Sequence, residues 1–312
     1  MIRPWETLMA LLQFRRPSPG PAVSGAPLEA FLRGWSLEVM PRTAAGIEDF
    51  RALLPAGTRV YVAHIAGTAT DDLVATAARL RREGFEPMPH FPARVIPDRA
   101  ALADLVARYR GEAGVRQALL LGGSPKVPAG DFHASMQLIE TGLFDAFERL
   151  HVAGHPEGNR DIDPAGGERA VMEALRWKAA FAARTDAAMA VVTQFAFDAA
   201  PVIAWAERLR AEGFGLPIHV GLAGPAKLQT LIRFAVACGV GPSLSVLQRR
   251  ARDVTRLVKP FEPTGVAEAL AAHKAAEPAS LIAGAHLFPL GGIRASAEWV
   301  RAQGPGRAVA EG

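Results

Sequence analysis

Glu38 is the side chain whose type and setting point most clearly to chemistry. It lies in the segment WSLEVMP, residues 35–41, whose composition predicts a buried strand. Strand alternation places Glu38 on the opposite face from Leu37 and Val39. A buried carboxylate is costly unless it is paired or takes part in a reaction, and burial raises its pKa. The segment therefore predicts a group that exchanges a proton near neutral pH.

Gln194 is a second candidate, in the apolar segment VVTQFAFD that covers residues 191–198. Regular alternation puts Phe195 and Phe197 on one face and Gln194 on the other, together with Val192. If the phenylalanines pack against outer helices, the amide of Gln194 faces a site, where its donor and acceptor suit the edge of a heterocycle. A glutamine satisfied by neighbouring backbone groups is an equally good alternative.

A glycine turn follows another apolar run, in the segment LLLGGSPK of residues 119–126. Gly122 and Gly123 let a ligand lie against the backbone, and Lys126 can meet a phosphate. An ordinary connection between a strand and a helix explains the same residues equally well.

The segment HPEGNRDID, residues 155–163, combines His155 with three carboxylates. Taken alone, such a set suggests a site for a hard cation. The proline and the later acidic residues also describe an ordinary loop, and no H-E-x-x-H motif occurs. We therefore expect no metal site. The sequence also lacks a G-x-S-x-G elbow and a Walker-type phosphate loop, which argues against a serine hydrolase and against nucleotide-triphosphate chemistry.

The elements that must position these side chains alternate between short apolar runs and longer amphipathic runs. Strands are predicted at 35–41, 59–66, 86–93, 117–123, 149–157, 189–197, 217–223 and 284–291. Helices are predicted at 71–83, 98–110, 133–147, 168–184, 199–212 and 225–238, with an irregular helical region at 243–276. This alternation is typical of parallel strands with crossover helices.

Eight strands in about 260 residues fit a single α/β domain of the (β/α)8 barrel type. A doubly wound open sheet is the alternative, but no G-x-G-x-x-G turn follows the first strand. Residues 1–25 are rich in Pro, Gly and Ser and are predicted to form an N-terminal arm, with the barrel in residues 26–312.

Chemistry in such barrels lies at the carboxyl ends of the strands, and those ends are polar here. They carry Glu38, His64, His90, residues 122–124, residues 155–157, Gln194, Asp198, residues 221–224 and His286. Strand ends are polar in many proteins, so no single member of this set is decisive.

Composition narrows the classes further, because half of the 312 residues are hydrophobic and the net charge is only +4. No basic cluster is interleaved with aromatic residues, so no nucleic-acid partner is expected. Arg249, Arg250 and Arg252 form the densest basic group, either a solvated helix face or a dock for an anionic tail. The sequence lacks an apolar run of about 18 residues and a signal-peptide core, so a cytoplasmic protein with no membrane span is expected. Cys238 is expected to be a buried structural thiol.

Four short motifs, in order along the chain, resemble those of the methylenetetrahydrofolate reductase family of (β/α)8 flavoproteins. SLEVMP at 36–41 resembles the family's opening strand, S-F-E-F-F-P, and Pro89 with His90 matches the end of its third strand. VVTQFAFD resembles its sixth strand, I-T-Q-F-F-F-D. HLFPL at 286–290 resembles its last strand, H-F-Y-T-L. The resemblance extends over residues 35–300.

The resemblance implies that NAD(P)H reduces FAD, which passes hydride to the methylene carbon of 5,10-methylenetetrahydrofolate. It implies that Glu38 is the general acid that protonates the departing nitrogen and that Gln194 contacts the pterin ring. Arg294 lies close to the family's arginine for the folate tail. Positions that correspond to the flavin site are His64, His90, Gly122, Gly123, His155, Asn159 and Lys178.

Several departures from the family fall among the flavin contacts. The family's fourth strand ends in L-R-G-D, where this chain has LLGG at 120–123. The family's Y-P-E-x-H motif reads HPEGN at 155–159 in this chain. Trp177 stands where the family has an arginine, directly before the position of Lys178. Two hypotheses follow: FAD is held through altered contacts, or hydride passes directly between NAD(P)H and folate. The reaction can also run as an oxidation of 5-methyltetrahydrofolate.

Rival classes are a pterin-binding barrel that transfers a methyl group without redox chemistry, an inactive folate-binding barrel, and a metal-dependent lyase. The first has less use for a buried acid on the first strand and none for a nicotinamide. Loss of activity on addition of a chelator would identify the metal-dependent lyase.

Overall fold

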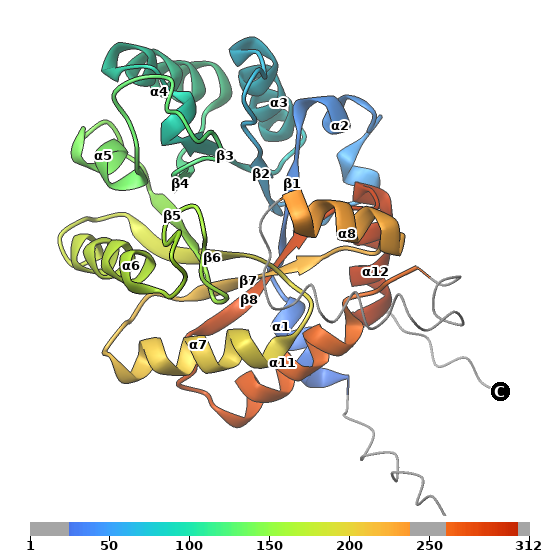
Figure 1. The fold of residues 1–312 in the computed structure, drawn as a ribbon. Helices are drawn as coiled ribbons and strands as arrows, with labels where there is room; N and C mark the ends of the chain where they lie inside the picture. The colour runs from blue at the N-terminus through green and yellow to red at the C-terminus, as the bar shows by residue number, and fades with distance from the viewer. Residues whose placement is uncertain (1–24, 238–259, 305–312) are drawn as a thin grey trace, which may run out of the picture.

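Eight parallel strands close into a barrel in sequential order, and helices surround it, in the computed structural model of residues 25–237 and 260–304 (Figure 1). Each strand pairs with the next along the chain, and β8 pairs with β1. The predicted (β/α)8 barrel is therefore confirmed, and the open doubly wound sheet is excluded.

The strands begin and end close to the predicted limits. They are β1 (Ser36–Val39), β2 (Arg59–Val62), β3 (Glu86–Pro92), β4 (Gln117–Leu121), β5 (Arg149–Gly154), β6 (Ala188–Ala196), β7 (Ile218–Ala223) and β8 (Ile282–Phe288). The predicted ranges 59–66 and 149–157 were too long, because β2 ends at Val62, two residues before His64, and β5 ends at Gly154, directly before His155 and Pro156.

The helices follow the strands in turn. They are α1 (Ala26–Leu32), α2 (Pro41–Ala45), α3 (Thr70–Arg82), α4 (Arg99–Ala113), α5 (Ser135–Glu140), α6 (Arg169–Ala182), α7 (Ala199–Ala211), α8 (Leu228–Ala237), α11 (Thr264–Ala276) and α12 (Ile293–Gln303). Short 3-10 helices lie at η2 (Phe50–Ala52) and η3 (Ala93–Val95). Within the described ranges, no helix is long and apolar enough to cross a bilayer.

Helix prediction was least accurate at residues 133–147. The helix there ends at Glu140, and Gly142 adopts a φ of 74°, which takes the chain out of the helical conformation. Helices α1, α2 and α12 were not predicted. Of the helical region 243–276, the structure describes α11. Residues 1–24, Cys238, Arg249, Arg250 and Arg252 lie outside the described residues.

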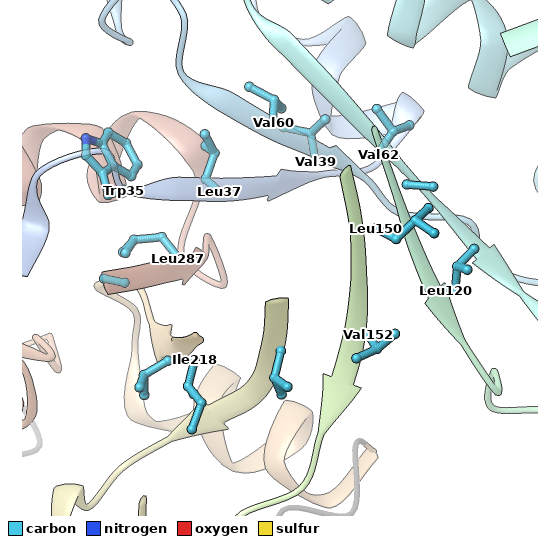
Figure 2. Packing of buried hydrophobic residues seen from close by; sticks show 14 of the residues in the cluster. Trp35, Leu37, Val39, Val60, Val62, Leu120, Leu150, Val152, Ile218 and Leu287 are labelled. Carbon is cyan, nitrogen blue, oxygen red and sulfur yellow. The ribbon is translucent and has the colours of Figure 1, made fainter. Parts of the chain in front are cut away.

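The main hydrophobic core lies between the barrel and its helices, as Figure 2 shows for Leu37, Val39, Val60 and Val62. Leu37 and Val39 are 0% and 1% exposed, so the predicted outward face of β1 is confirmed. Each such side chain contributes about 1.5–3 kcal/mol on burial. A smaller apolar cluster fills the barrel interior; it consists of Tyr61, Met88, Leu119 and Val192, with Leu121 packed against it.

Strand β6 contains a bulge that inverts its alternation. Val192 pairs with His219 and Phe195 with Gly221, so β6 advances three residues while β7 advances two. The extra backbone groups are satisfied locally, because the Thr193 hydroxyl accepts a hydrogen bond from Gly221 N at 2.9 Å and donates one to Gln194 O at 2.8 Å. A Cβ at Gly221 would lie 2.6 Å from the carbonyl oxygens of Thr193 and Gln194, so the bulge requires glycine there.

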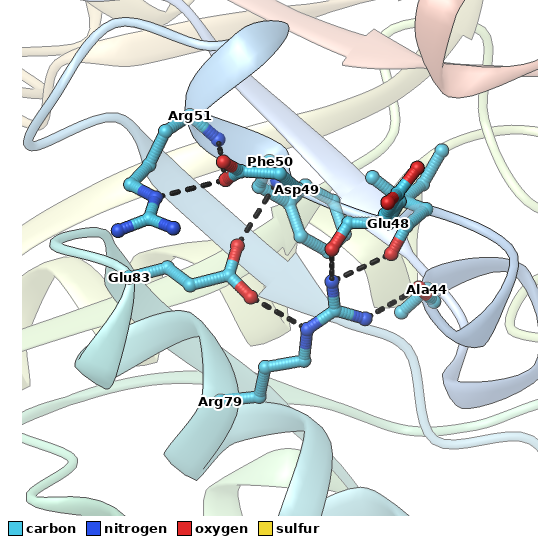
Figure 3. Close-up of polar contacts among 8 residues, drawn as sticks. Ala44, Glu48, Asp49, Phe50, Arg51, Arg79 and Glu83 are labelled. Carbon is cyan, nitrogen blue, oxygen red and sulfur yellow. Dashed lines mark hydrogen bonds and ion pairs between the residues drawn. The ribbon is translucent and has the colours of Figure 1, made fainter.

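A polar network fixes the connection between β1 and β2 (Figure 3). The Arg79 guanidinium donates to the backbone oxygens of Ala44, Ile47 and Glu48 and, at 2.6 Å, to the Glu83 carboxylate. Glu83 also accepts from Phe50 N at 3.0 Å. One arginine on α3 thereby holds the chain that leaves β1, the strand that carries Glu38.

Candidate active site at the carboxyl ends of the strands

Glu38 and His90 meet inside the barrel, where β1 and β3 bring them together across β2. The His90 Nε2 atom lies 3.3 Å from Glu38 Oε2, without the angles of a hydrogen bond. Register pairs Glu38 with Tyr61 on β2, and the Tyr61 ring is 6.1 Å from the His90 ring. The structure therefore joins two of the residues predicted from sequence and adds Tyr61 to them.

Burial raises the pKa of Glu38 from 4.5 to about 7. The carboxyl group loses hydration inside the barrel, and this loss disfavours the charged form. Its side chain nevertheless keeps 22% of its surface exposed, so a proton can leave for solvent or for a ligand. A carboxyl group with this pKa is partly protonated at neutral pH and is suited to general acid–base work.

The histidines near Glu38 are held in the neutral form. Burial lowers the pKa of His90 to about 3, and the nearby His64 adds to this effect. Burial also lowers the pKa of His64. Among the described residues, His90 Nε2 and His64 Nδ1 are buried and have no hydrogen-bond partner. These nitrogens leave the Glu38 proton in place at neutral pH and are free to bond to a ligand.

Further histidines line the interior, and the sequence analysis did not assign them together. His286 Nδ1 and Ser36 Oγ are 2.9 Å apart, and His151 Nδ1 and Tyr61 Oη are 2.5 Å apart. His219 stacks on His151 with ring centres 5.1 Å apart. The sequence signal for these histidines is a polar residue between two apolar ones, which occurs as LHV, IHV and AHL on three strands.

For Phe195 and Phe197 the sequence set only a condition, that Gln194 faces a site if they pack against outer helices. Phe195 lies 5.3 Å from the ring of Phe288, which is 4.9 Å from His286 inside the barrel, and Phe195 and Phe197 also share an apolar cluster with residues of α8. The bulge turns Phe195 away from the outward face, where Ala196 takes its place. With Phe261, these rings form a cluster that we call the mouth phenylalanines: Phe195, Phe197, Phe261 and Phe288.

Gln194 lies within the bulge and is half-buried. Its Oε1 accepts a hydrogen bond from Phe195 N at 3.1 Å. This contact matches the alternative in which neighbouring backbone groups satisfy the amide. No described contact links Gln194 to Glu38. Its role toward a ligand stays a prediction.

His155, Asn159 and Lys178 gather at the end of β5 and on α6. Asn159 Nδ2 is 3.4 Å from His155 Nδ1, and burial together with Lys178 lowers the pKa of His155 to about 4. Lys178 is only 7% exposed, and burial lowers its pKa to about 8. In the part of the chain that the structure describes, this lysine has no ion-pair partner. A buried cation of this kind fits an anionic group of a ligand.

Gly122 and Gly123 form the predicted turn after β4. Gly123 has a φ of 88°, and a Cβ there would lie 3.0 Å from Cβ of Pro92, so the turn packs closely on the end of β3. Arg294 is exposed in the first turn of α12. No described contact joins Arg294 to Glu38.

No group of three or more His, Cys, Asp or Glu side chains with the arrangement of a metal site occurs in residues 25–237 and 260–304. The loop carboxylate of Asp163 instead accepts hydrogen bonds from Ala170 N at 3.0 Å and Val171 N at 3.1 Å, at the start of α6.

No family model matches the chain. Among solved structures, it is similar to a protein of Clostridium thermocellum described as binding two copies of 5-methyl-5,6,7,8-tetrahydrofolic acid, with a TM-score of 0.57 and 11% identity. That alignment covers 88% of this chain and 96% of the other. The Yersinia pestis DHPS with a pterine-sulfa conjugate gives a TM-score of 0.41 and 11% identity over 89% and 93% of the two chains. At such low identity the first similarity shows only a shared fold. The TM-score of the second is too low to support an inference.

The raised pKa of Glu38 predicts how its removal changes stability. Because the folded pKa is about 7 and the unfolded pKa about 4.5, the folded state holds more protons between these values, and stability from this group is lost as the pH rises through 7. Replacing Glu38 by Gln removes that loss. We expect Glu38→Gln to gain on the order of 2 kcal/mol over the wild type at pH 8.5 and little at pH 5.

Urea unfolding of both proteins from pH 5 to 9 measures this difference. The buried histidines make stability rise with pH, the opposite of the effect of Glu38. They are present in both proteins, so their contribution cancels in the difference between the two unfolding free energies. A difference that stays constant over the range would contradict burial of an ionisable Glu38.

Proposed function

We propose that this chain catalyses the NAD(P)H-linked interconversion of 5,10-methylenetetrahydrofolate and 5-methyltetrahydrofolate, with Glu38 as the general acid–base. The observation that carries the proposal is a carboxyl group inside the barrel mouth with a pKa of about 7. The order of the four sequence motifs and the fold shared with a barrel described as binding 5-methyl-5,6,7,8-tetrahydrofolic acid support it.

The proposed reaction requires one proton, delivered to the nitrogen that leaves the methylene carbon. The five-membered ring of methylenetetrahydrofolate must open to an iminium ion before hydride can add, and ring opening places electrons on the departing nitrogen. Protonated Glu38 donates to that nitrogen as the carbon–nitrogen bond breaks. Hydride then adds to the methylene carbon and forms the methyl group. In the oxidative direction the Glu38 carboxylate takes the proton back.

The surroundings of Glu38 suit this role. His90, with a pKa of about 3, does not compete for the proton at neutral pH. Its unpartnered Nε2 offers a polar contact beside the carboxyl group. On the side of β6 and β8, Phe195, Phe197 and Phe261 are buried against Leu228 and Leu231 of α8, and the partly buried Phe288 is the mouth phenylalanine that a flat heterocycle can contact. Gln194 is proposed to contact the pterin edge.

We propose FAD as the carrier of hydride, held in part by Lys178, His155 and Asn159. The lysine is buried without a described carboxylate partner, so an anionic phosphate would satisfy it. When bound, the flavin supplies a group that accepts hydride from NAD(P)H and passes it on. LLGG at 120–123 provides backbone at the place where the reductase family has an Arg and an Asp, so the contacts there differ.

An inactive folate-binding barrel is the second candidate, because fold similarity to a folate-binding protein supports binding and no more. The raised pKa of Glu38 favours the enzyme, because ring opening requires a proton donor at this place whereas binding requires only a hydrogen-bonding group.

Replacing Glu38 by Gln is expected to lower folate-dependent NAD(P)H oxidation about 10²–10⁴-fold, because the amide keeps the shape but cannot donate an acidic proton. In the wild type, kcat/KM for the reductive direction should fall as the pH rises above about 7, where Glu38 loses its proton. Steady-state kinetics from pH 5.5 to 9 measure both effects. Glu148→Gln, which removes an exposed carboxylate at the other end of the barrel, is the matched control. Full turnover in Glu38→Gln would remove the assignment.

The purified protein is expected to show flavin absorbance, and Lys178→Ala is expected to carry less flavin because it removes the buried cation. Visible spectra and flavin released on denaturation measure the content. If the wild type shows no flavin bands and gains no activity from added FAD, the FAD proposal fails. Nicotinamide oxidation that persists without flavin would then point to direct hydride transfer.

Arg294 is proposed to bind the carboxylates of the folate tail from the exposed start of α12. Arg294→Ala should raise KM for polyglutamylated folate several-fold and leave kcat unchanged, because the tail lies away from the reacting atoms. An unchanged KM would exclude this contact.

A further inference from the structure

A second polar cluster lies at the opposite end of the barrel from Glu38. We call it the barrel floor; it consists of Arg59 on β2, Glu86 on β3, Gln117 on β4 and Arg149 on β5. Arg59 Nε donates to Gln117 Oε1 at 2.7 Å, and Gln117 stands beside Arg149 in the strand register. Each of these residues opens its strand and points to the same side as the interior residue two positions later.

The barrel floor holds more positive charge than its carboxylate neutralises. Glu86 already accepts from Arg81 at 2.7 Å and from Gln117 Nε2 at 3.1 Å. Among the described residues, Arg149 has no hydrogen-bond or ion-pair partner, and Arg59 uses only its Nε. Two guanidinium groups therefore face the interior with most of their donors unused, and burial together with the Arg149 charge lowers the pKa of Arg59. The two like charges repel, less strongly than in a dry interior because both side chains are half-buried.

His151 supplies an independent sign of a missing partner. The residue is 0% exposed and lies two positions after Arg149 on the same face of β5. Its Nδ1 is 2.5 Å from Tyr61 Oη, whereas its Nε2 is buried with no partner among the described residues. Burial raises the pKa of Tyr61, so its hydroxyl keeps its hydrogen. When that hydroxyl donates to Nδ1, the ring hydrogen sits on Nε2, which becomes a donor without an acceptor.

In that tautomer of His151, the unused groups of the barrel floor share one chemistry, since they donate and do not accept. The Arg59 and Arg149 guanidiniums and His151 Nε2 come from two strands joined across the interior by the Tyr61–His151 contact. We propose that the barrel floor binds a small tetrahedral oxyanion, with inorganic phosphate as the fitting ligand. The planar guanidinium fork matches two phosphate oxygens, and His151 donates to a third.

The floor is open enough for an ion to enter. Arg59, Arg149 and His219 are half-buried, and Ala188, the register partner of Arg149 on β6, is exposed and presents only a methyl group. The site is separate from Glu38 and does not depend on the proposed folate reaction.

Titration of the full-length protein with inorganic phosphate, at constant ionic strength set by sodium chloride, tests the proposal. We expect the thermal midpoint to rise with phosphate and to saturate, with sulfate acting in the same way and chloride not. Isothermal calorimetry should show phosphate binding about tenfold or more weaker in Arg149→Gln, because a charge-assisted pair of hydrogen bonds is lost. Without phosphate, Arg149→Gln should melt at or above the wild-type temperature, since the repulsion with Arg59 is removed.

Matched variants make the outcome decisive. Arg116→Gln removes an exposed arginine one residue before Gln117, paired with Glu148 at 2.9 Å, and should leave phosphate affinity unchanged. Arg149→Lys retains the charge but not the fork and should bind with intermediate affinity, which serves if the glutamine variant does not fold. The proposal is overturned if chloride gives the same stabilisation, if Arg149→Gln binds phosphate as the wild type does, or if Lys178→Gln rather than Arg149→Gln abolishes binding.

Discussion

Closure of the barrel removes bulk water from the space between the strands, and the state of every polar group inside follows from that desolvation. Glu38 and His90 show this most directly, because one cause moves their pKa values in opposite directions, to about 7 and to about 3. Near neutral pH His90 is uncharged and Glu38 is partly protonated. The contact between them is therefore not an ion pair, and it does not need the geometry of one.

The barrel mouth is divided by the order of its strands. Neighbouring strands β1 to β3 contribute Glu38 and His90, with His64 just beyond the end of β2, whereas β6 and β8 contribute Phe195, Phe197 and Phe288. The first group is polar, whereas the second belongs to an apolar cluster that is buried apart from Phe288. This division depends on the β6 bulge, since regular alternation would turn Phe195 and Phe197 outward and leave the β6 side of the mouth without them.

Sequence reasoning succeeded where the signal is periodic and local. The alternation of strands and helices predicted the barrel, and the alternation of SLEV predicted which way Glu38 faces. It failed where one residue breaks the period. The bulge between Val192 and Phe195 depends on Gly221, which is 27 positions after Gln194 in the chain, so no local pattern in β6 reveals it. The early end of α5 at Glu140 has a local signal in the sequence, the glycine at position 142.

The sequence pattern also identified the interior polar side chains one by one, but it did not predict which of them lie together. A histidine between apolar residues occurs in β5, β7 and β8, but only closure of the barrel brings His151 and His286 to the Tyr61 ring and stacks His219 on His151. The same holds for Arg59 and Arg149, which are 90 positions apart in the chain. Residues that the sequence offers as isolated polar exceptions thus become one connected layer through tertiary structure alone.

The lowered histidine pKa values have a consequence for how protons are counted in this molecule. His90 and His219 titrate near 3 and 4, and His151 and His286 also lie well below their usual value. Tyr61 keeps its proton at any mild pH. Of these interior groups and Glu38, only Glu38 changes charge around neutrality, and buried Lys178 on α6, with a pKa of about 8, is the other group described above that does so. A proton exchanged beside the barrel histidines near neutral pH therefore comes from Glu38 and not from the histidines themselves.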